Sequence, residues 1–382
     1  MMLQGQARPR PPVNRSQANP GIHPLSPLTT QRSQPLPAPL GEPPFHFDLE
    51  TVIPGITKRA AKLGKLIFHC VGDTGGIKSP EYQTEVAAAM KGDLNLPLTH
   101  RPQFFYHLGD VVYYNGEVAK YYDQFYEPYD HYGAPILAIA GNHDGDPINA
   151  AQTSLDGWAR YFMSPKPVVH PESQDAPRVT LSLPNVFYTL NCPFATIVGM
   201  YTNVPEGGAI DSIQQQWLTH EFATAPMNKA LIVAMHHPIY SFDDHHAGSA
   251  RMADAVQHAI NDSRRVPNLV MAAHVHNFQR IERKLVETSM TPFIVAGHGG
   301  YFHLHGILGG KGTTDPNTGA TLMFEEHQHH GYMTLTVDHK LITGTMQSMA
   351  NGTGKFKTPG PTDNFSYPAK AIKLKKNQII SL

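Results

Sequence analysis

The sequence predicts an α/β protein in which strands and helices build layered sheets. Short apolar runs with the length of buried strands recur beyond residue 60, and amphipathic helical patterns lie between several of them. No repeat of about 20–50 residues indicates a solenoid or a propeller. Strands that alternate with helices and are flanked by further strands are typical of layered α/β proteins.

Eight apolar runs are the expected strands. Each is long enough for a strand and too short for an independent buried helix. In chain order they are Lys65–Val71, Phe104–Leu108, Pro135–Ala140, Ala195–Met200, Ala230–Met235, Asn268–Ala273, Pro292–Ala296 and Tyr332–Val337.

Two of the expected helices can be placed from their start and stop signals. The first begins at Ser79-Pro80, because serine caps helix N-termini and proline suits the first turn. The second ends before Pro267, which cannot continue a helix. Their apolar faces consist of Tyr82, Val86, Ala89 and Met90 in the first, and of Met252, Val256, Ala259 and Ile260 in the second.

The two ends of the chain differ in composition from the middle. Residues 1–48 are expected to form a disordered, proline-rich extension, since eleven prolines occur up to Pro44 and no acidic residue precedes Glu42. The alternative is that this arm is a polyproline ligand for a partner protein. Residues 60–350 are expected to form one domain, and residues 351–382 a peripheral basic tail.

Composition and charge exclude several classes of function. Thirty Lys and Arg residues against 31 Asp and Glu residues give a net charge of −1, so neither a nucleic-acid nor a membrane partner is expected. Cys70 and Cys192 cannot build a disulfide framework, which favours a reducing compartment. No apolar run approaches the roughly 18–20 residues of a membrane span, and no secretory signal is seen. These observations predict a cytoplasmic protein.

Five of the expected strands end in turns of small residues that carry metal-ligand side chains. Because the carboxyl ends of such strands lie at one rim of a sheet, where α/β proteins place their sites, five such turns are unlikely to coincide by chance. The turns are Gly72-Asp73-Thr74-Gly75, Gly109-Asp110-Val111-Val112-Tyr113, Gly141-Asn142-His143-Asp144, Val233-Ala234-Met235-His236 and Ala273-His274-Val275-His276.

This ordered set resembles the calcineurin-like metallophosphoesterase superfamily, and within it the purple acid phosphatase branch. Most members of the superfamily have a histidine two residues after the first aspartate, where this chain has Gly75, while Tyr113 follows Asp110 by three residues. That exchange is the pattern of the purple phosphatases. The resemblance implies a single catalytic domain built as a layered α/β-β/α sandwich of two mixed sheets flanked by helices.

The same resemblance implies a binuclear metal centre. Asp73, Asp110, Tyr113 and His276 would hold the first metal, and Asp110 would bridge to a second metal held by Asn142, His236 and His274. Oxygen and phenolate donors suit Fe(III), whereas imidazoles with an amide oxygen suit Zn(II), Mn(II) or Fe(II). Two such metals clamp a phosphate ester and lower the pKa of bound water, so that hydroxide attacks phosphorus.

Three further histidines are candidate catalytic residues. By resemblance, His143 contacts the phosphate or helps to protonate the leaving group, the alternative being a structural histidine. His245 and His246, nine and ten residues beyond His236, could bind a phosphoryl oxygen or donate a proton, the alternative being an exposed pair in a loop. No role is assigned to His298, His303, His305, His327, His329 or His330.

The leading hypothesis is therefore a binuclear, metal-dependent phosphoric ester hydrolase that resembles an acid phosphatase. A phosphodiesterase or nucleotide hydrolase on the same core is the first alternative, because pocket loops decide between these substrates. The second alternative is a catalytically silent scaffold of the same fold. Every expected ligand position is filled, which favours catalysis.

Overall fold

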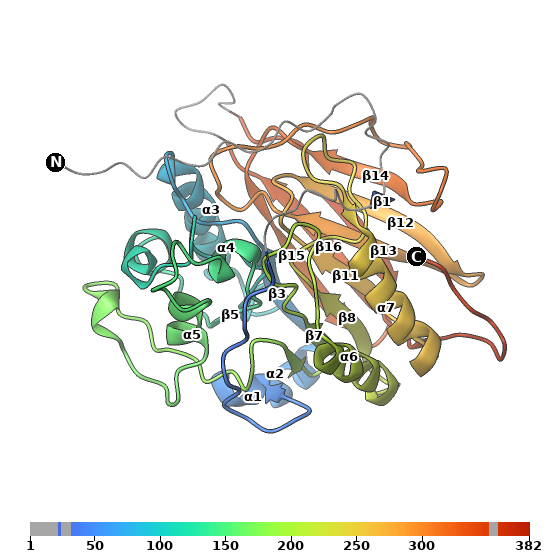
Figure 1. Cartoon of the computed structure of the whole chain (residues 1–382), viewed down its shortest axis with the longest axis horizontal. Helices are drawn as coiled ribbons and strands as arrows, with labels where there is room; N and C mark the ends of the chain where they lie inside the picture. Colours follow the sequence, from blue (N-terminus) through green and yellow to red (C-terminus); the bar gives the residue numbers. More distant parts are fainter. Residues whose placement is uncertain (1–21, 24–31, 351–357) are drawn as a thin grey trace.

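Two mixed β-sheets form the centre of the protein, and helices lie outside them (Figure 1). The computed structural model describes residues 22–23, 32–350 and 358–382. The larger sheet has the order β14 (Thr321–Glu326), β12 (Phe278–Val286), β13 (Ser289–Ala296), β11 (Leu269–Ala272), β8 (Ala230–Ala234), β7 (Ala195–Gly199), β6 (Tyr188–Asn191) and β2 (His46–Asp48). The smaller has the order β17 (Asp363–Pro368), β16 (Leu341–Ser348), β15 (Gly331–Asp338), β3 (Lys65–Val71), β4 (Phe105–His107) and β5 (Ile136–Ala138). This architecture confirms the predicted fold class.

Each of the eight predicted runs overlaps a strand, and β3 of one sheet contacts β11 of the other. Strand β3 is buried along nearly its whole length, as expected for a continuous apolar run with chain on both faces. Its Cys70 thiol lies 3.7 Å from the sulfur of Met271 on β11, which belongs to the other sheet. Both cysteines are free and buried, and burial raises the pKa of each thiol. They are therefore packing residues of the core.

The helices flank the two sheets. They are α1 (Leu49–Val52), α2 (Ile56–Leu63), α3 (Pro80–Asp93), α4 (Asn142–Gly145), α5 (Asp156–Phe162), α6 (Ser212–Thr224) and α7 (Ala250–Ser263), with short 3-10 or π turns at Val118–Lys120, Tyr122–Tyr126 and Pro171–Ser173. Figure 1 shows α6 and α7 side by side near β8 and β11, and α3 near β3 and β15. Helix α3 begins at Pro80 as predicted, although the Ser79 side chain makes no capping hydrogen bond.

Residues 32–48, expected to belong to a disordered arm, pack on the domain instead. Strand β2 pairs in parallel with β6 at the edge of the larger sheet, and Phe45 and Phe47 are buried. The Trp217 indole N–H donates to the carbonyl of Pro44. Burial of the two phenylalanine side chains stabilises this segment on the domain, which the high proline content did not indicate. Ile22–His23 form strand β1, which pairs with β9 (Gly248–Ser249), and the rest of residues 1–31 lies outside the described part of the chain.

The C-terminal segment is likewise part of the fold over most of its described length. Strand β17 pairs with β16, and Asp363 at its start forms a bidentate ion pair with Arg280 of β12. Strand β18 (Ile372–Lys373) pairs with β10 (Arg265–Val266). The expected boundary at residue 350 is therefore wrong. Strand β17 is the outermost strand of the smaller sheet, and alternate side chains along it are buried. Residues 351–357 lie outside the description.

We expect removal of residues 1–48 to destabilise the protein. Each buried phenylalanine contributes about 1.5–3 kcal/mol to the free energy of unfolding, and both Phe45 and Phe47 would be lost with strand β2. Thermal unfolding of a chain that begins at Leu49 measures the effect, and a chain that begins at Arg32 is the control because it keeps both rings. Equal melting temperatures for these two chains would contradict the packing described here.

No helix in the described part of the chain is both long and apolar enough to cross a lipid bilayer.

Candidate metal centre

The predicted ligands come together where the parallel strands of the two sheets end. Strands β3, β4 and β5 are parallel neighbours in one sheet, and β8 and β11 are parallel neighbours in the other. The turns that follow them are hydrogen-bonded to one another. Asp73 N–H donates to the carbonyl of Gly109, and the Nδ1–H of His236 donates across the two sheets to the carbonyl of Leu108. The carboxyl ends of both sheets thus form a single rim.

Three of these ligand positions have a left-handed backbone. Asp73, Asp110 and His274 have φ values of 54°, 55° and 67°. This conformation is uncommon outside glycine, and it persists where the surrounding structure fixes it, as at functional sites. Gly141 accommodates the second of these turns, because a Cβ atom there would lie 2.2 Å from Oδ1 of Asp110. These backbone conformations therefore direct the side chains of Asp73 and Asp110 toward the other ligand positions.

Asp73, Tyr113 and His276 form the first group of donors. The Tyr113 hydroxyl donates to Oδ1 of Asp73 at 2.9 Å and lies 3.3 Å from Nε2 of His276. Nε2 of His276 is 3.7 Å from the same Asp73 oxygen. All three side chains are buried, and burial followed by the nearby carboxylates of Asp110 and Asp73 raises the pKa of the Tyr113 phenol well above its usual value.

Tyr113 is held in place by Gln124, which lies outside the five turn motifs. Its backbone N–H donates to the side-chain oxygen of Gln124, and the Gln124 amide donates back to the Tyr113 carbonyl. A Cβ atom at position 75 would lie 2.7 Å from the Tyr113 ring and 2.5 Å from the Gln124 oxygen. A side chain at position 75 would therefore clash with the Tyr113 ring and with Gln124, and glycine avoids both clashes.

Asn142, His236 and His274 form the second group. The Asn142 side-chain oxygen lies 3.0 Å from Nε2 of His236 and 2.9 Å from Nδ1 of His274. Each imidazole uses its other nitrogen elsewhere, His236 toward the Leu108 carbonyl and His274 toward a carboxylate. In the neutral imidazoles, the two nitrogens that face Asn142 therefore carry lone pairs, as does the amide oxygen. In that state the three lone pairs are available to one bound cation.

Asp110 lies between the two groups. Its Oδ1 accepts the backbone N–H of His143 at 2.9 Å, and its Oδ2 is 3.4 Å from Nε2 of His236. Desolvation opposes its ionisation, but the attraction of His236 and of other nearby imidazoles holds the pKa of Asp110 well below its usual value. Conversely, the same carboxylate raises the pKa of His236 to about 9 against the effect of burial. Asp110 is placed to be shared by two cations.

The donor set fits a pair of metal ions. Oδ2 of Asp73 and Oδ2 of Asp110 are buried and make no hydrogen bond within the described residues. Asp73, Asp110 and His236 bring one ligand atom each within 4.8 Å of one another. Burial and the charge of Asp110 act to raise the pKa of Asp73, so two carboxylates this close are costly without a compensating positive charge. Metal cations would supply that charge.

Both carboxylate oxygens of Asp144 accept hydrogen bonds from the backbone of the rim. Its carboxylate accepts the backbone N–H groups of Gly141, Val111 and Val112. Burial, and then the neighbouring Asp110 charge, raise the pKa of Asp144. These bonds tie the turn after β4 to the turn after β5, so Asp144 positions both Asp110 and Asn142.

His143 lies on the Tyr113 side of the centre. Its Nδ1–H donates to the carbonyl of Tyr114 at 2.8 Å, and its ring centroid is 4.6 Å from that of Tyr113. The side chain is partly exposed, unlike the buried ligands. The Tyr114 contact fixes the ring tautomer, so Nε2 is the nitrogen left for a bound molecule.

His245 and His246 have different surroundings. The His246 ring lies 4.5 Å from that of His274, beside the second group of donors. The His245 ring stacks on His305 at 4.4 Å, and its Nδ1 is 2.5 Å from Asp244. His305 in turn lies 4.6 Å from His276. His246 therefore adjoins the centre directly, whereas His245 reaches it through His305.

Sequence reasoning missed Glu206, Asp243 and His305. Oε1 of Glu206 is 3.0 Å from Nδ1 of His246 and 3.3 Å from Nε2 of His274. Asp243 accepts the backbone N–H groups of His245 and His246 and approaches Nδ1 of His305. Glu206 has a usable signal, because it lies in the glycine-containing loop that follows one of the predicted strands. His305 follows no strand motif and could not be distinguished from its neighbours.

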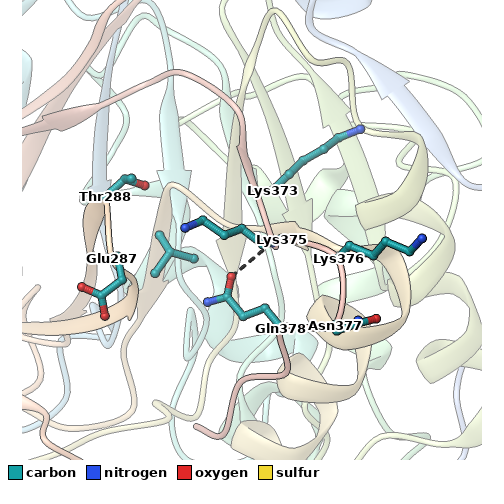
Figure 2. A pocket seen from close by; sticks show the side chains of 8 residues that line it. Glu287, Thr288, Lys373, Lys375, Lys376, Asn377 and Gln378 are labelled. Atoms are coloured by element: carbon teal, nitrogen blue, oxygen red, sulfur yellow. Dashed lines mark hydrogen bonds between the residues drawn. The ribbon is translucent and has the colours of Figure 1, made fainter.

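A separate pocket lies away from this centre (Figure 2). Its volume is about 330 Å³, and it is lined by the β12–β13 turn and by Lys373, Lys375 and Lys376 of the C-terminal segment. The β12–β13 turn is at the opposite end of β12 from His276. The pocket is therefore not part of the metal centre.

The comparisons with known proteins agree with this geometry. The family model described as calcineurin-like phosphoesterase matches residues 67–278, a range that holds all seven predicted metal ligands. No curated protein matches the chain.

Two solved structures share the fold at low sequence identity. The purple acid phosphatase PPD1 isolated from yellow lupin (Lupinus luteus) seeds superposes with a TM-score of 0.55 at 18% identity, over 79% of this chain and 54% of that one. This chain thus spans about half the length of the lupin protein. GAP50, described as the anchor in the inner membrane complex of Plasmodium, has a TM-score of 0.54 at 16% identity, over 82% of this chain and 90% of that one.

Proposed function

The chain belongs to the calcineurin-like phosphoesterase family, and on that premise we propose that it hydrolyses phosphoric esters at a binuclear metal centre of the purple acid phosphatase type. One observation carries the proposal: seven donor side chains from both sheets converge around two buried carboxylate oxygens that make no hydrogen bond within the described residues. A scaffold would have no need of this convergence of ligand side chains.

The two groups of donors differ in chemistry. Asp73, Tyr113 and His276 would hold Fe(III) together with Asp110, because carboxylate and phenolate oxygens suit a hard trivalent ion. Asn142, His236 and His274 would complete the second site with Asp110 and hold Zn(II), Mn(II) or Fe(II). When bound, such a pair polarises the phosphoryl oxygens and lowers the pKa of a coordinated water.

The partly exposed histidines would handle the substrate. His143 presents Nε2 beside Tyr113 because its Nδ1–H is committed to the Tyr114 carbonyl, and in its protonated form it donates to the leaving oxygen. His246, with His245 behind it, would contact a phosphoryl oxygen from its place beside His274. The substrate would thus be held between two sets of imidazoles.

Hydrolysis of simple aryl esters tests the proposed function. We expect protein loaded with iron and zinc to contain two metal ions per chain and to hydrolyse 4-nitrophenyl phosphate, bis(4-nitrophenyl) phosphate or both. A chelator should remove the activity and added metal should restore it. The ratio of monoester to diester turnover decides between a phosphatase and a phosphodiesterase. Fully loaded protein that hydrolyses neither ester would overturn the proposal in favour of a silent scaffold.

The iron-loaded protein should be coloured, and Tyr113→Phe should lose the colour. Coordination of tyrosinate to Fe(III) gives a ligand-to-metal charge-transfer band, and a trivalent cation is needed to ionise a phenol whose pKa is raised by burial. The visible spectrum of both proteins checks this. Tyr114→Phe is the matched control, because its ring lies beside Tyr113 but does not belong to the donor group. A band that survives in Tyr113→Phe would exclude tyrosinate ligation.

A further inference from the structure

One carboxylate contacts both a metal-ligand histidine and a candidate substrate-binding histidine. Oε1 of Glu206 is 3.3 Å from Nε2 of His274 and 3.0 Å from Nδ1 of His246. Both distances are within hydrogen-bond range, and a carboxylate accepts hydrogen bonds, so both imidazoles donate to Glu206.

The contact with His274 fixes which nitrogen can bind metal. Because Nε2–H of His274 donates to Glu206, the lone pair of the neutral ring is on Nδ1, which is the nitrogen 2.9 Å from the Asn142 oxygen. The opposite tautomer would point a proton into the second donor group. A carboxylate behind a ligand histidine also makes the ligating nitrogen more basic.

The contact with His246 fixes the second ring in the same way. Nδ1–H donates to Glu206, which sets the rotation of the His246 ring against His274 at a centroid distance of 4.5 Å. The backbone N–H of His246 is held independently by Asp243 at 2.7 Å. Both the main chain and the ring of His246 are therefore restrained.

The loop that carries Glu206 is closed and attached to the His246 loop. Gly208 N–H donates to the Pro205 carbonyl at 2.7 Å, and Ala209 N–H donates to the Thr202 carbonyl at 2.7 Å. The Ser249 hydroxyl, three residues beyond His246, donates to the carbonyl of Gly207. The carboxylate is thus built on a short, hydrogen-bonded turn whose position depends on the His246 loop.

We propose that Glu206 is a positioning residue that fixes the His274 tautomer for the second metal and the His246 ring for the substrate. The inference rests on the proposed function for the substrate part, whereas the part that concerns metal affinity holds whether or not the protein hydrolyses esters. Glu206 would make the second metal site and the substrate contact depend on one carboxylate.

Glu206→Gln tests the metal part. The amide has the same shape but no charge, and removal of such a partner typically lowers metal affinity about 10–100-fold. We expect a decrease of that size for zinc at the second site, measured by competition with a chelator on iron-loaded protein. The charge-transfer band should stay unchanged, because Glu206 contacts none of Asp73, Tyr113 and His276. Glu206→Asp, which restores the charge, should recover part of the zinc affinity.

Glu221→Gln is the matched control, because Glu221 also accepts from a histidine, His46, but this pair lies at the β2 edge of the larger sheet, three strands away from β8. It should leave zinc affinity unchanged. Zinc affinity of Glu206→Gln within twofold of the wild type would overturn the proposal. So would a third zinc ion in the wild type that is lost in Glu206→Gln, since Glu206 would then be a ligand in a set with His246 and His274.

His246→Ala separates the two roles. It should lower kcat at saturating zinc while zinc affinity stays near that of the wild type, whereas Glu206→Gln should change both. A long-range proton–nitrogen correlation spectrum of the zinc-loaded protein should show His274 protonated at Nε2 in the wild type. Protonation at Nδ1 would contradict the tautomer assignment independently of any activity.

Discussion

Replacing Asp110 with asparagine is expected to empty both metal sites together. Asp110 lies between the two donor groups, with Oδ2 3.4 Å from Nε2 of His236 and making no hydrogen bond within the described residues. The asparagine keeps the shape and the bond from the His143 N–H but removes the charge that both cations would share. The loss of affinity should exceed the roughly 10–100-fold cost of losing a residue that only supports a ligand.

Elemental analysis after gel filtration measures this effect, with turnover of an aryl phosphate as the second readout. Asp93→Asn is the matched control, because Asp93 also contacts a buried histidine, His69, but lies at the end of α3 away from the rim. The control should retain both metals even if its melting temperature falls. Two metals bound to Asp110→Asn with wild-type affinity would remove Asp110 from the bridging position.

Most of the strands that could be predicted are buried on both faces, although β15, which was also predicted, alternates buried and half-buried side chains. Strand β3 is a continuous apolar run because it lies between β15 and β4 with chain above and below, and β8 and β11 have the same character. Strand β12 has the sequence FQRIERKLV, in which Arg280 and Glu282 form an ion pair. Its polar side chains are satisfied only by partners distant in sequence, so no local pattern revealed the strand.

The grouping of the candidate ligands could be predicted because each of their turns follows a strand that was itself predictable. A strand end fixes where the next side chain lies, which is why Asp73, Asp110, Asn142, His236 and His274 can be grouped from the sequence. Glu206 and His305 enter the site from loops whose course depends on tertiary contacts. Glu206 is placed by the bonds that close residues 202–209 and by Ser249, and none of these can be read from spacing.

His143→Ala should lower turnover by roughly 10²–10⁴-fold without changing the metal content. The ring is not among the donors that converge on Asp73 and Asp110, and it is partly exposed beside Tyr113. The backbone N–H that His143 donates to Asp110 is kept in the alanine variant, so the bridging carboxylate should hold its position. The effect should therefore fall on the chemical step.

The dependence on the leaving group decides what His143 does. If its Nε2 protonates the leaving oxygen, the loss in His143→Ala should be large for an alkyl phosphate and small for 4-nitrophenyl phosphate, whose leaving group needs little protonation. If the ring only binds the phosphoryl group, both substrates should lose equally. His131→Ala is the control, because His131 is exposed and lies before β5, at the end of that strand away from the rim. Loss of metal together with activity in His143→Ala would show that His143 is a ligand and would refute its assignment as the acid.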